Sequence, residues 1–441
     1  MPIAPKDNFL YGVATSAAQI EGAAWEDGRL DSIWDVFARK KGKIKDRSHP
    51  SPGCDHYHLW QKDVENLVWL GVNAYRFSLS WSRLIPLGRG ELNPKGVSFY
   101  QRLLAALRKN DIRPYVTLYH WDLPQSLEDK GGWTNRDITS WFVEYAHKVD
   151  KALGEFIDSY IILNEPLVFT ALGYLLGIHA PGRRGLANFL KAMHHALLAQ
   201  AEAARAIRAQ NKQVRLGTSI SCVMGYPYRQ QEKDLRALAR FDALMNRLFV
   251  DPVVGRGYPT QELPVLKKAE RYFAPQDLEK ICFDFDFWGI NSYTTKLVKY
   301  AWYVPYVHYR EIRRDLPRTE MDWEIEPQGI YDLLKKFGSY PEIKEILISE
   351  NGAAFYDEVI GGKIYDFRRI NYLKQHLAMV EKARQEGVPV RGYFVWSLMD
   401  NFEWAEGFRM RFGLFYVNYE TKERLPKESA WWYRELIRGN T

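Results

Sequence analysis

Several features are scarce or absent in this chain of 441 residues, and each absence excludes a class of protein. Its three cysteines, Cys54, Cys222 and Cys282, lie far apart without paired spacing, which argues against a disulfide framework or a structural zinc site. A reducing cytoplasm is therefore the expected location. No apolar run approaches the length of a membrane span. The segment from Met1 to Asn8 carries two prolines and no apolar run of the kind that marks a secretory signal.

The chain also lacks linkers. No Ser/Gly-rich stretch, charge block or low-complexity segment interrupts it. Its length alone would allow two or three domains, but without a linker we expect residues 1–441 to form a single large domain. The composition, 46% hydrophobic and 26% charged, is globular and leaves ample apolar material for one core.

The charge of +7 does not indicate a nucleic-acid-binding protein. Lys and Arg are scattered among 54 acidic residues and form no basic stripe. The chain is instead rich in aromatic residues, with 15 Trp, 27 Tyr and 22 Phe. Flat rings stack on sugar faces, although large cores also use them.

Short apolar runs alternate with longer stretches of helical periodicity. The expected strands are 9–15, 74–80, 114–119, 160–163, 215–221, 287–291, 346–349 and 392–396. The expected helices are 57–70, 94–109, 136–153, 186–210, 232–249, 328–337, 367–386 and 427–437. Eight such units in this length predict an α/β fold in the form of a closed (β/α)8 TIM barrel.

An open, doubly wound sheet is the alternative to a barrel. It would typically carry a glycine-rich turn after the first strand, but here Ser16 to Gly22 contains neither a dinucleotide fingerprint nor a phosphate loop. We therefore expect no cofactor.

Two carboxylates stand at the ends of buried strands. Glu165 follows the run from Ile161 to Asn164, and Glu350 follows Ile346 to Ser349. In a barrel, such positions share the C-terminal rim, where active sites collect. The other polar and aromatic side chains expected on this rim are Gln19, Arg76, Ser80, His120, Trp121, Asn164, Asn291, Tyr293, Asn351, Trp396, Glu403 and Trp404.

Two acids across a barrel mouth suit the cleavage of a glycosidic bond. One protonates the leaving oxygen, and the other attacks the anomeric carbon or activates water; a separation of about 5–5.5 Å means retention and about 6.5–9.5 Å inversion. A metal site is disfavoured, because hard metals usually gather more carboxylates. His120 is the only imidazole expected on the rim, and His194 and His195 lie in an Ala/Leu-rich helix where they pack.

The two acids need opposite protonation states. Arg76 is the natural partner of Glu350 inside the barrel, and with a hydroxyl donor such as Tyr293 it would keep that carboxylate ionised. Glu165 faces this negative charge, which should raise its affinity for a proton. One pair of residues would thus supply both a nucleophile and an acid.

The chain resembles the retaining β-glycosidases of glycoside hydrolase family 1 from Phe9 to about Trp432. The resemblance is carried by Phe9 to Thr15, Gln19 to Gly22, Tyr75 to Ser78, Tyr119 to Pro124, Asn164 to Pro166, Glu350 to Gly352 and Gly392 to Gly413. It implies that Glu350 is the nucleophile and Glu165 the general acid/base. It further implies glycone binding by Gln19, His120, Asn164, Glu403 and Trp404, a stacking floor at Trp396, and support of the nucleophile by Arg76, Asn291 and Tyr293.

Some positions depart from the family pattern without removing a catalytic group: Tyr11, Ala18, Tyr160, Ile162, Ser292 and Ser349. Members that act on 6-phosphorylated sugars lack an acid at the position of Glu403, whose carboxylate would repel a phosphate. Thioglucosidases of the family replace the acid/base by Gln. Glu403 and Glu165 therefore favour neutral β-glycosides or oligosaccharides with an O-linked leaving group. We expect a β-glucosidase that also accepts β-galactosides and β-fucosides, but glucose, galactose, fucose and mannose all stay open as glycones, since axial and equatorial hydroxyls differ in position and not in the residue type they require.

Two other functions stay open at this point. In transglycosylation, an alcohol replaces water as the acceptor. A carbohydrate-binding receptor on the same barrel would typically have lost one carboxylate. The aglycone side is expected in loops 168–177, 222–229 and 294–323, the last of which is either an aromatic platform or a packed loop.

Overall fold

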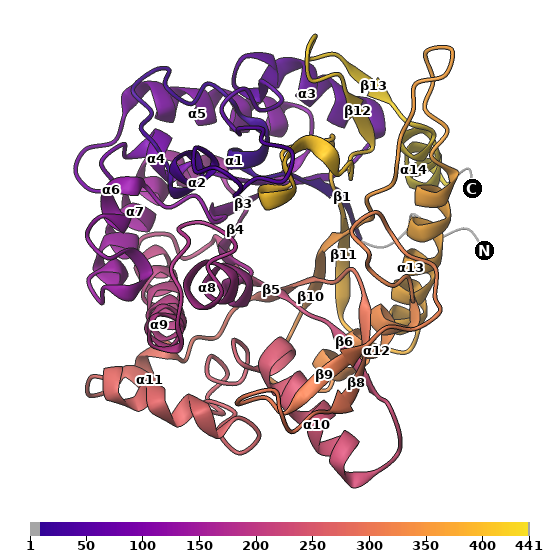
Figure 1. Cartoon of the computed structure of the whole chain (residues 1–441). Helices are drawn as coiled ribbons and strands as arrows, with labels where there is room; N and C mark the ends of the chain where they lie inside the picture. Colours follow the sequence, from indigo (N-terminus) through magenta and orange to yellow (C-terminus); the bar gives the residue numbers. More distant parts are fainter. Residues whose placement is uncertain (1–8, 440–441) are drawn as a thin grey trace.

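Eight parallel strands close into a barrel at the centre of the molecule (Figure 1). The computed structural model describes residues 9–439, so Met1 to Asn8 and the inference drawn from them lie outside it. Around the barrel the order is β1-β11-β10-β7-β5-β4-β3-β2. Their bounds are β1 Leu10–Ala14, β2 Ala74–Ser78, β3 Arg113–Tyr119, β4 Ser159–Asn164, β5 Arg215–Ser221, β7 Phe287–Asn291, β10 Ile346–Asn351 and β11 Val390–Trp396. The predicted barrel is confirmed, with each strand end within two residues of its expected place.

The strands are buried on both faces, as parallel strands covered by helices must be. Inside the barrel, Tyr115 of β3 contacts Phe287 of β7 and Phe394 of β11, with ring centroids 5.8 and 5.3 Å apart. Gly12 of β1 leaves room for Phe394, since a Cβ there would lie 2.3 Å from that ring. This packed interior holds the strand ends in fixed positions.

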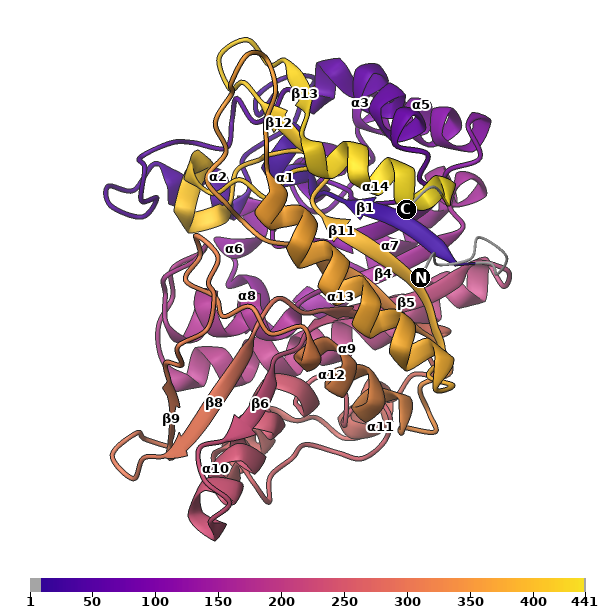
Figure 2. The ribbon, with the colours of Figure 1, turned by 90° about the vertical axis from the view of Figure 1, so that its right-hand side faces the viewer.

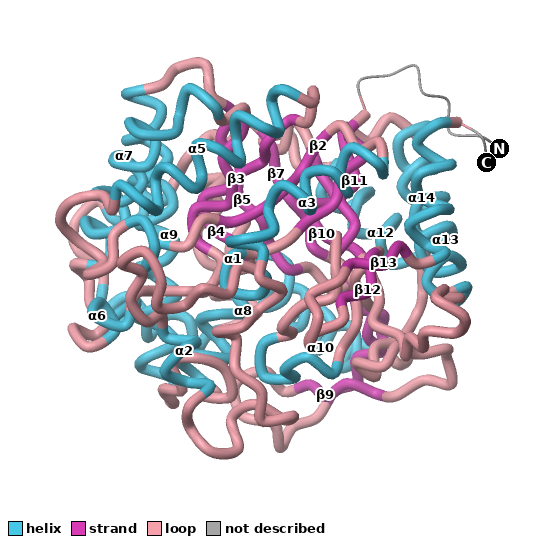
Figure 3. The backbone as a smooth tube through the Cα atoms, turned by 90° about the horizontal axis from the view of Figure 1, so that it is seen from above, coloured by secondary structure: helices cyan, strands magenta, loops and turns pink. Residues whose placement is uncertain are grey.

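Helices surround the strands, and loops gather at one end of the barrel (Figure 3). The longer helices are α3 His56–Leu70, α5 Pro94–Lys109, α7 Ile138–Leu153, α9 Leu186–Gln210, α10 Glu232–Asp242, α12 Gln328–Gly338, α13 Phe367–Gln385 and α14 Glu428–Arg438. The short ones are α1 Ala17–Ile20, α2 Ile33–Ala38, α4 Trp81–Leu84, α6 Gln125–Glu128, α8 Pro166–Thr170 and α11 Asp277–Ile281.

Local signals set the ends of several helices. Helix α5 begins at Pro94, whose missing N–H is not needed in the first turn, and the Asn93 side chain accepts a hydrogen bond from the Lys95 amide at 3.3 Å. Helix α3 ends at Leu70, and the Gly71 that follows it adopts φ 79° and donates its amide to the Leu67 carbonyl. These ends lie within one residue of those that periodicity predicted.

One predicted helix was wrong at its C-terminal end. Periodicity suggested a continuous helix over 232–249, but α10 ends at Asp242 and a wider π-helical turn follows over Ala243–Arg247. The side chain of Asn246 exchanges two hydrogen bonds of 3.0 Å with the backbone of Val223. The widened turn presents Asn246 to that neighbouring segment.

The region 294–323, expected to be a loop, contains strands. β8 Thr295–Tyr300 pairs with β9 Tyr309–Ile312 as an antiparallel hairpin, and β6 Met224–Pro227 adds to it in parallel. This small sheet projects from the barrel beside α10 (Figure 2). A second hairpin joins β12 Phe415–Val417 to β13 Arg424–Pro426. That residues 1–441 form a single domain stays a prediction.

Among the described helices, none is both long and apolar enough to cross a membrane.

Candidate active site

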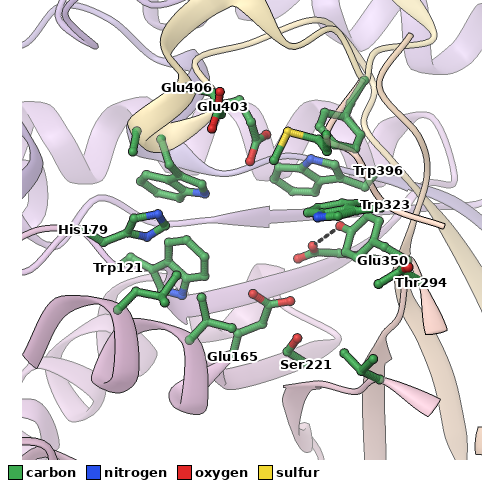
Figure 4. Close-up of a pocket in the computed structure, with 18 of the residues that line it drawn as sticks. Trp121, Glu165, His179, Ser221, Thr294, Trp323, Glu350, Trp396, Glu403 and Glu406 are labelled. Atoms are coloured by element: carbon green, nitrogen blue, oxygen red, sulfur yellow. Dashed lines mark hydrogen bonds between the residues drawn. The ribbon is translucent and has the colours of Figure 1, made fainter. Parts of the chain in front are cut away.

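The carboxyl ends of the barrel strands open into a pocket of about 320 Å³. Figure 4 shows Glu165 and Glu350 projecting into it from opposite sides, with Trp121 and His179 on one flank and Trp323 and Trp396 on the other. Of the eleven predicted site residues, seven line this pocket: His120, Glu165, Tyr293, Glu350, Trp396, Glu403 and Trp404. The other four, Gln19, Arg76, Asn164 and Asn291, are buried behind its wall. The structure therefore gathers all eleven.

Glu165 is placed by an unusual backbone. It follows β4 and precedes Pro166, the first residue of α8, and its φ of 48° and ψ of 61° lie in the left-handed region. Its amide donates to the Ser219 carbonyl of β5 at 2.8 Å. Asn291 at the end of β7 donates to its Oε1 at 2.9 Å. The turn from β4 to α8 thus directs the carboxylate into the pocket.

Glu350 is held from two sides. The Arg76 guanidinium of β2 pairs with Oε1 and also donates to the Ser349 carbonyl at 2.9 Å. The Tyr293 hydroxyl donates to Oε2 at 2.6 Å. Both oxygens of Glu350 therefore accept hydrogen bonds, which favours the ionised carboxylate. The predicted pairing of Arg76 and Tyr293 with Glu350 is present.

Asn164 connects the two acids. Its Oδ1 accepts from Arg76 at 2.5 Å and from Asn291 at 3.0 Å, so its Nδ2 is the end that faces His120 Nε2 at 3.0 Å. With Nδ2 donating, His120 accepts at Nε2 and carries its proton on Nδ1. Burial and the charge of Arg76 hold the pKa of His120 well below its usual range, so the ring is neutral.

Burial and a neighbouring charge both raise the pKa of Glu165. Burial raises the pKa of Glu165 to about 8, with a further contribution from the negative charge of Glu350, while Asn291 and Arg76 oppose the shift. Glu165 therefore holds a proton at neutral pH. The second-largest cause of this shift is the charge of the facing carboxylate, as the sequence led us to expect.

A third acid faces the pocket from the loop after β11. Burial raises the pKa of Glu403 to about 8, helped by the charge of Glu350 and opposed by hydrogen bonds from Trp396 and Gln19. Its Oε2 is buried without a hydrogen-bond partner among the described residues, and so is Nδ1 of His120. Buried polar atoms normally have partners, so a ligand would complete these two.

Aromatic rings form much of the wall. The Trp404 ring lies 4.6 Å from that of Trp121, and the Trp396 ring is stacked at 5.8 Å on the ring of His120. Gln19 fixes the loop that bears Glu403, since its Nε2 donates to Asn401 at 3.0 Å and to the Phe402 carbonyl at 2.9 Å. This part of the pocket combines flat apolar surfaces with hydrogen-bonding groups.

Sequence reasoning missed part of the wall. His179 also lines the pocket, so the expectation of a single imidazole on the rim was wrong. It lies between α8 and α9, away from any strand end, and no pattern marked it. In the region 294–323, Trp323 and Met321 line the pocket, whereas Trp302 and Tyr303 are exposed outside it.

Two other expectations can be placed in the structure. His194 and His195 are buried in α9, where His194 contacts Asp277 at 2.8 Å and His195 contacts the Trp133 carbonyl at 2.9 Å. They have the packing role predicted. In the part of the chain that the structure describes, no cluster of three or more His, Cys, Asp or Glu side chains could hold a metal ion.

A parallel barrel with two facing carboxylates in an aromatic pocket defines a glycosidase. The sequence profile described as glycosyl hydrolase family 1 matches residues 3–441. Beta-glucosidase A of Acetivibrio thermocellus is 42% identical, over 99% of this chain and 98% of the relative. Beta-glucosidase A of Thermotoga maritima is 43% identical over 98% of each chain. A solved family 1 β-glucosidase from Thermotoga maritima superposes with a TM-score of 0.95 at 42% identity, covering 98% of both chains.

The chain belongs to glycosyl hydrolase family 1 and is an O-glycosyl hydrolase of the β-glucosidase type. The resemblance identified from its motifs is confirmed.

Proposed function

We propose that the protein is a retaining exo-β-glycosidase that removes terminal non-reducing β-D-glycosyl residues by double displacement. The observation that carries the proposal is the contrast between its two acids. Glu350 accepts hydrogen bonds on both oxygens from Arg76 and Tyr293, as a charged nucleophile should. Glu165 has a pKa of about 8, as an acid that protonates a leaving oxygen at neutral pH should.

In the first step, Glu350 attacks the anomeric carbon while Glu165 donates its proton to the departing glycosidic oxygen. The resulting glycosyl ester removes the negative charge of Glu350. That charge is one of the causes that raise the pKa of Glu165, so the pKa falls and Glu165 becomes able to accept a proton from water. The water attacks the ester, and the sugar leaves with its original configuration.

The glycone contacts follow from the polar atoms left without partners. The Nδ1 donor of His120 and the Oε2 acceptor of Glu403 suit sugar hydroxyls. We assign Gln19, Asn164 and Trp404 to the same subsite, and Trp396 to the floor beneath the ring. Asn291 and Arg76 position the two acids.

The preferred substrates are neutral β-glycosides. Glu403, the buried Phe412 and the half-buried Trp323 offer no cation to a sugar phosphate, and Lys296, which also lines the pocket, is paired with Glu311 at 2.7 Å. We propose activity on galactosides and fucosides as well as glucosides. The Thermotoga maritima relative, 42% identical, has been solved with both glucoimidazole and galacto-hydroximolactam, which supports a pocket that tolerates either configuration.

The aglycone side of the pocket is largely apolar. Val168, Leu172 and Met321 line it, together with Trp323. An aryl or alkyl leaving group would therefore gain from contact here. A reducing cytoplasm remains the proposed compartment, and the three cysteines are free in the structure.

The test is a set of initial rates on 4-nitrophenyl β-gluco-, β-galacto-, β-fuco- and 6-phospho-β-glucosides, with proton NMR of the first sugar released. We expect turnover of the neutral substrates, the β-anomer as the first product, and a loss of at least about 10³-fold in the Glu350→Ala variant. An α-anomer as first product would overturn retention. Turnover of none of the substrates by the folded wild type would favour a sugar-binding protein, and transfer to added methanol in place of hydrolysis would favour a transglycosidase.

A further inference from the structure

A second pocket lies on the outside of the barrel. It has a volume of about 520 Å³ and is formed by α10, the 3₁₀ segment Pro264–Tyr272 and the connection between β8 and β9. Its lining residues are Arg240, Gln261, Glu262, Pro264, Val265, Lys268, Tyr306 and His308. It shares no residue with the pocket that holds Glu165 and Glu350.

This outer pocket carries positive charge that no described residue neutralises. Its only acid, Glu262, is paired with Arg247 at 2.7 Å. Arg240 and Lys268 form no ion pair with any residue in the range 9–439, and the Nη1 nitrogen of Arg240 is buried without a hydrogen-bond partner there. A buried guanidinium nitrogen without an acceptor is costly, so an anion would complete the pocket.

Aromatic rings form another wall of the outer pocket. Tyr306 and His308 both have left-handed backbones, with φ of 67° and 49°. Such conformations cost of order 1 kcal/mol or more outside glycine and tend to persist at functional sites. Here the His308 amide donates to the Val304 carbonyl at 3.0 Å, and the Ala301 amide donates to the His308 carbonyl at 3.0 Å. These two bonds fix the backbone of the turn, and the His308 ring contacts the Trp302 carbonyl at 3.2 Å.

One cation of the outer pocket, Lys268, lies over the ring of Tyr306. The Lys268 ammonium lies 5.6 Å from the centre of the Tyr306 ring, so a ligand that contacts one also reaches the other. Tyr306, which lines the pocket, remains 50% exposed. A large exposed ring on the wall of a pocket is typical of a surface that meets a ligand.

We propose that this outer pocket binds a small organic anion that carries a flat ring, as an aromatic carboxylate does. Its carboxylate would pair with Arg240 and Lys268, and its ring would lie against Tyr306. The site is independent of the hydrolytic pocket and of the function proposed for it.

The test is isothermal titration calorimetry of the full chain with 2-naphthoate, 2-naphthamide and inorganic phosphate. We expect 2-naphthoate to bind with a dissociation constant on the order of 10⁻⁴ M, and each of the other two to bind at least about tenfold more weakly, since one lacks the charge and the other the ring. Equal affinity for 2-naphthamide or for phosphate would overturn the proposal.

Matched variants locate the site. Lys268→Gln should weaken the binding of 2-naphthoate about tenfold, whereas Lys109→Gln, which removes another exposed cation at the end of α5, should leave it unchanged. Lys268 is exposed, so its replacement leaves the fold intact; Arg240→Gln is the second variant. Unchanged affinity in Lys268→Gln, or affinity lost in Trp323→Ala of the hydrolytic pocket, would show that the ligand binds elsewhere.

Discussion

Two of the clusters of buried charge among the described residues differ in the balance of acids and cations. In the pocket cluster, one cation, Arg76, faces three acids, Glu165, Glu350 and Glu403. In the C-terminal cluster, three cations meet three acids: Lys427, Arg369, Arg411, Asp357, Asp366 and Asp400. Lys427 has no exposed surface, and its ammonium lies 2.5 Å from Asp357 and 2.7 Å from Asp400.

The ratio of acids to cations determines whether the pKa values of the acids in each cluster are raised or lowered. In the pocket cluster, burial raises the pKa values of Glu165 and Glu403 to about 8. In the C-terminal cluster, burial alone would raise the pKa of Asp357, but Lys427 and Arg369 outweigh it and hold the pKa below its usual value. A surplus of buried acids makes a site that can exchange protons near neutral pH. An equal number of acids and cations keeps the acids ionised and holds the segments that bear them together.

The two clusters are connected through one loop. Asp400 also accepts from the Gly413 amide at 2.9 Å, and it precedes Asn401, which holds Gln19. The C-terminal cluster therefore anchors the loop that supplies Glu403 and Trp404 to the pocket. The start of α14 thereby supports the sugar site, although no residue of α14 lines the pocket.

Removing the single cation of the pocket cluster should have the largest effect. Arg76→Met leaves Glu350 buried and uncompensated, a change of about 3–5 kcal/mol, so we expect kcat/KM on 4-nitrophenyl β-glucoside to fall by about 10²–10⁴-fold. Arg76→Lys keeps the charge, but a lysine cannot reach Glu350, Ser349 and Asn164 together. Its kcat/KM should therefore lie between the values of wild type and Arg76→Met. Activity within threefold of wild type in a folded Arg76→Met protein would contradict this role.

Removing the central cation of the balanced cluster should reduce stability. Lys427→Met leaves Asp357 and Asp400 facing each other, and we expect the free energy of unfolding in urea to fall by about 3–5 kcal/mol. The control is Lys148→Met, which removes a partly exposed ion pair with Glu144 within α7 and should cost less than about 0.5 kcal/mol. Equal losses in the two variants would show that the buried position of Lys427 is unimportant.

Removing the Tyr293 hydroxyl, the neutral hydrogen-bond donor to Glu350, should reduce the catalytic rate less than removing Arg76. Tyr293→Phe deletes the hydroxyl that donates to Oε2 at 2.6 Å. A hydrogen bond to a charged group contributes about 1.5–3 kcal/mol, so kcat should fall by about 10- to 100-fold. We expect KM to change little, because the lost contact is to the enzyme's own carboxylate. A rise in KM with unchanged kcat would place Tyr293 in substrate binding.

The two clusters should also give opposite responses to pH. The folded pKa of Glu165 is about 8 and its ordinary value is 4.5. The folded state thus holds an extra proton between these values, and this group lowers the free energy of unfolding as pH rises from about 4.5 to about 8. The depressed pKa of Asp357 acts the other way, so its contribution is present at neutral pH and is lost as acid protonates it.

Glu165→Gln isolates the first of these effects. At pH 8–9 we expect the variant to be more stable to urea than wild type by on the order of 4 kcal/mol, because a pKa raised from 4.5 to about 8 costs about 1.4 kcal/mol for each pH unit between them, and most of this difference should be gone near pH 5. A difference that does not change between pH 5 and pH 9 would mean that Glu165 is not protonated by its surroundings. In wild type, kcat/KM on an alkyl β-glucoside should decline above about pH 8, where the proton donor is lost.

The barrel and its two acids could be predicted because their signals are local. Each strand is a short apolar run, each helix has its own periodicity, and the strand ends of a barrel share one rim, so Glu165, Glu350 and Arg76 could be brought together from sequence alone. His179 could not, because its position depends on the path of a long connection, and Trp323 could be predicted only as part of the region 294–323. The ion pairs of Lys427 were equally hidden, since Asp357 lies 70 positions away and nothing in the sequence links the two.

The left-handed backbone of Glu165 also bears on how an inactive enzyme should be made. Most residues with a Cβ avoid that conformation, so the carboxylate is kept there at a cost of about 1 kcal/mol, while glycine adopts it freely. Glu165→Gly should therefore have a higher free energy of unfolding than Glu165→Ala, although both variants lack the carboxylate. At this position the residue needed for catalysis is therefore not the one that gives the highest stability. The glycine variant is the better choice for a complex with an uncleaved glycoside.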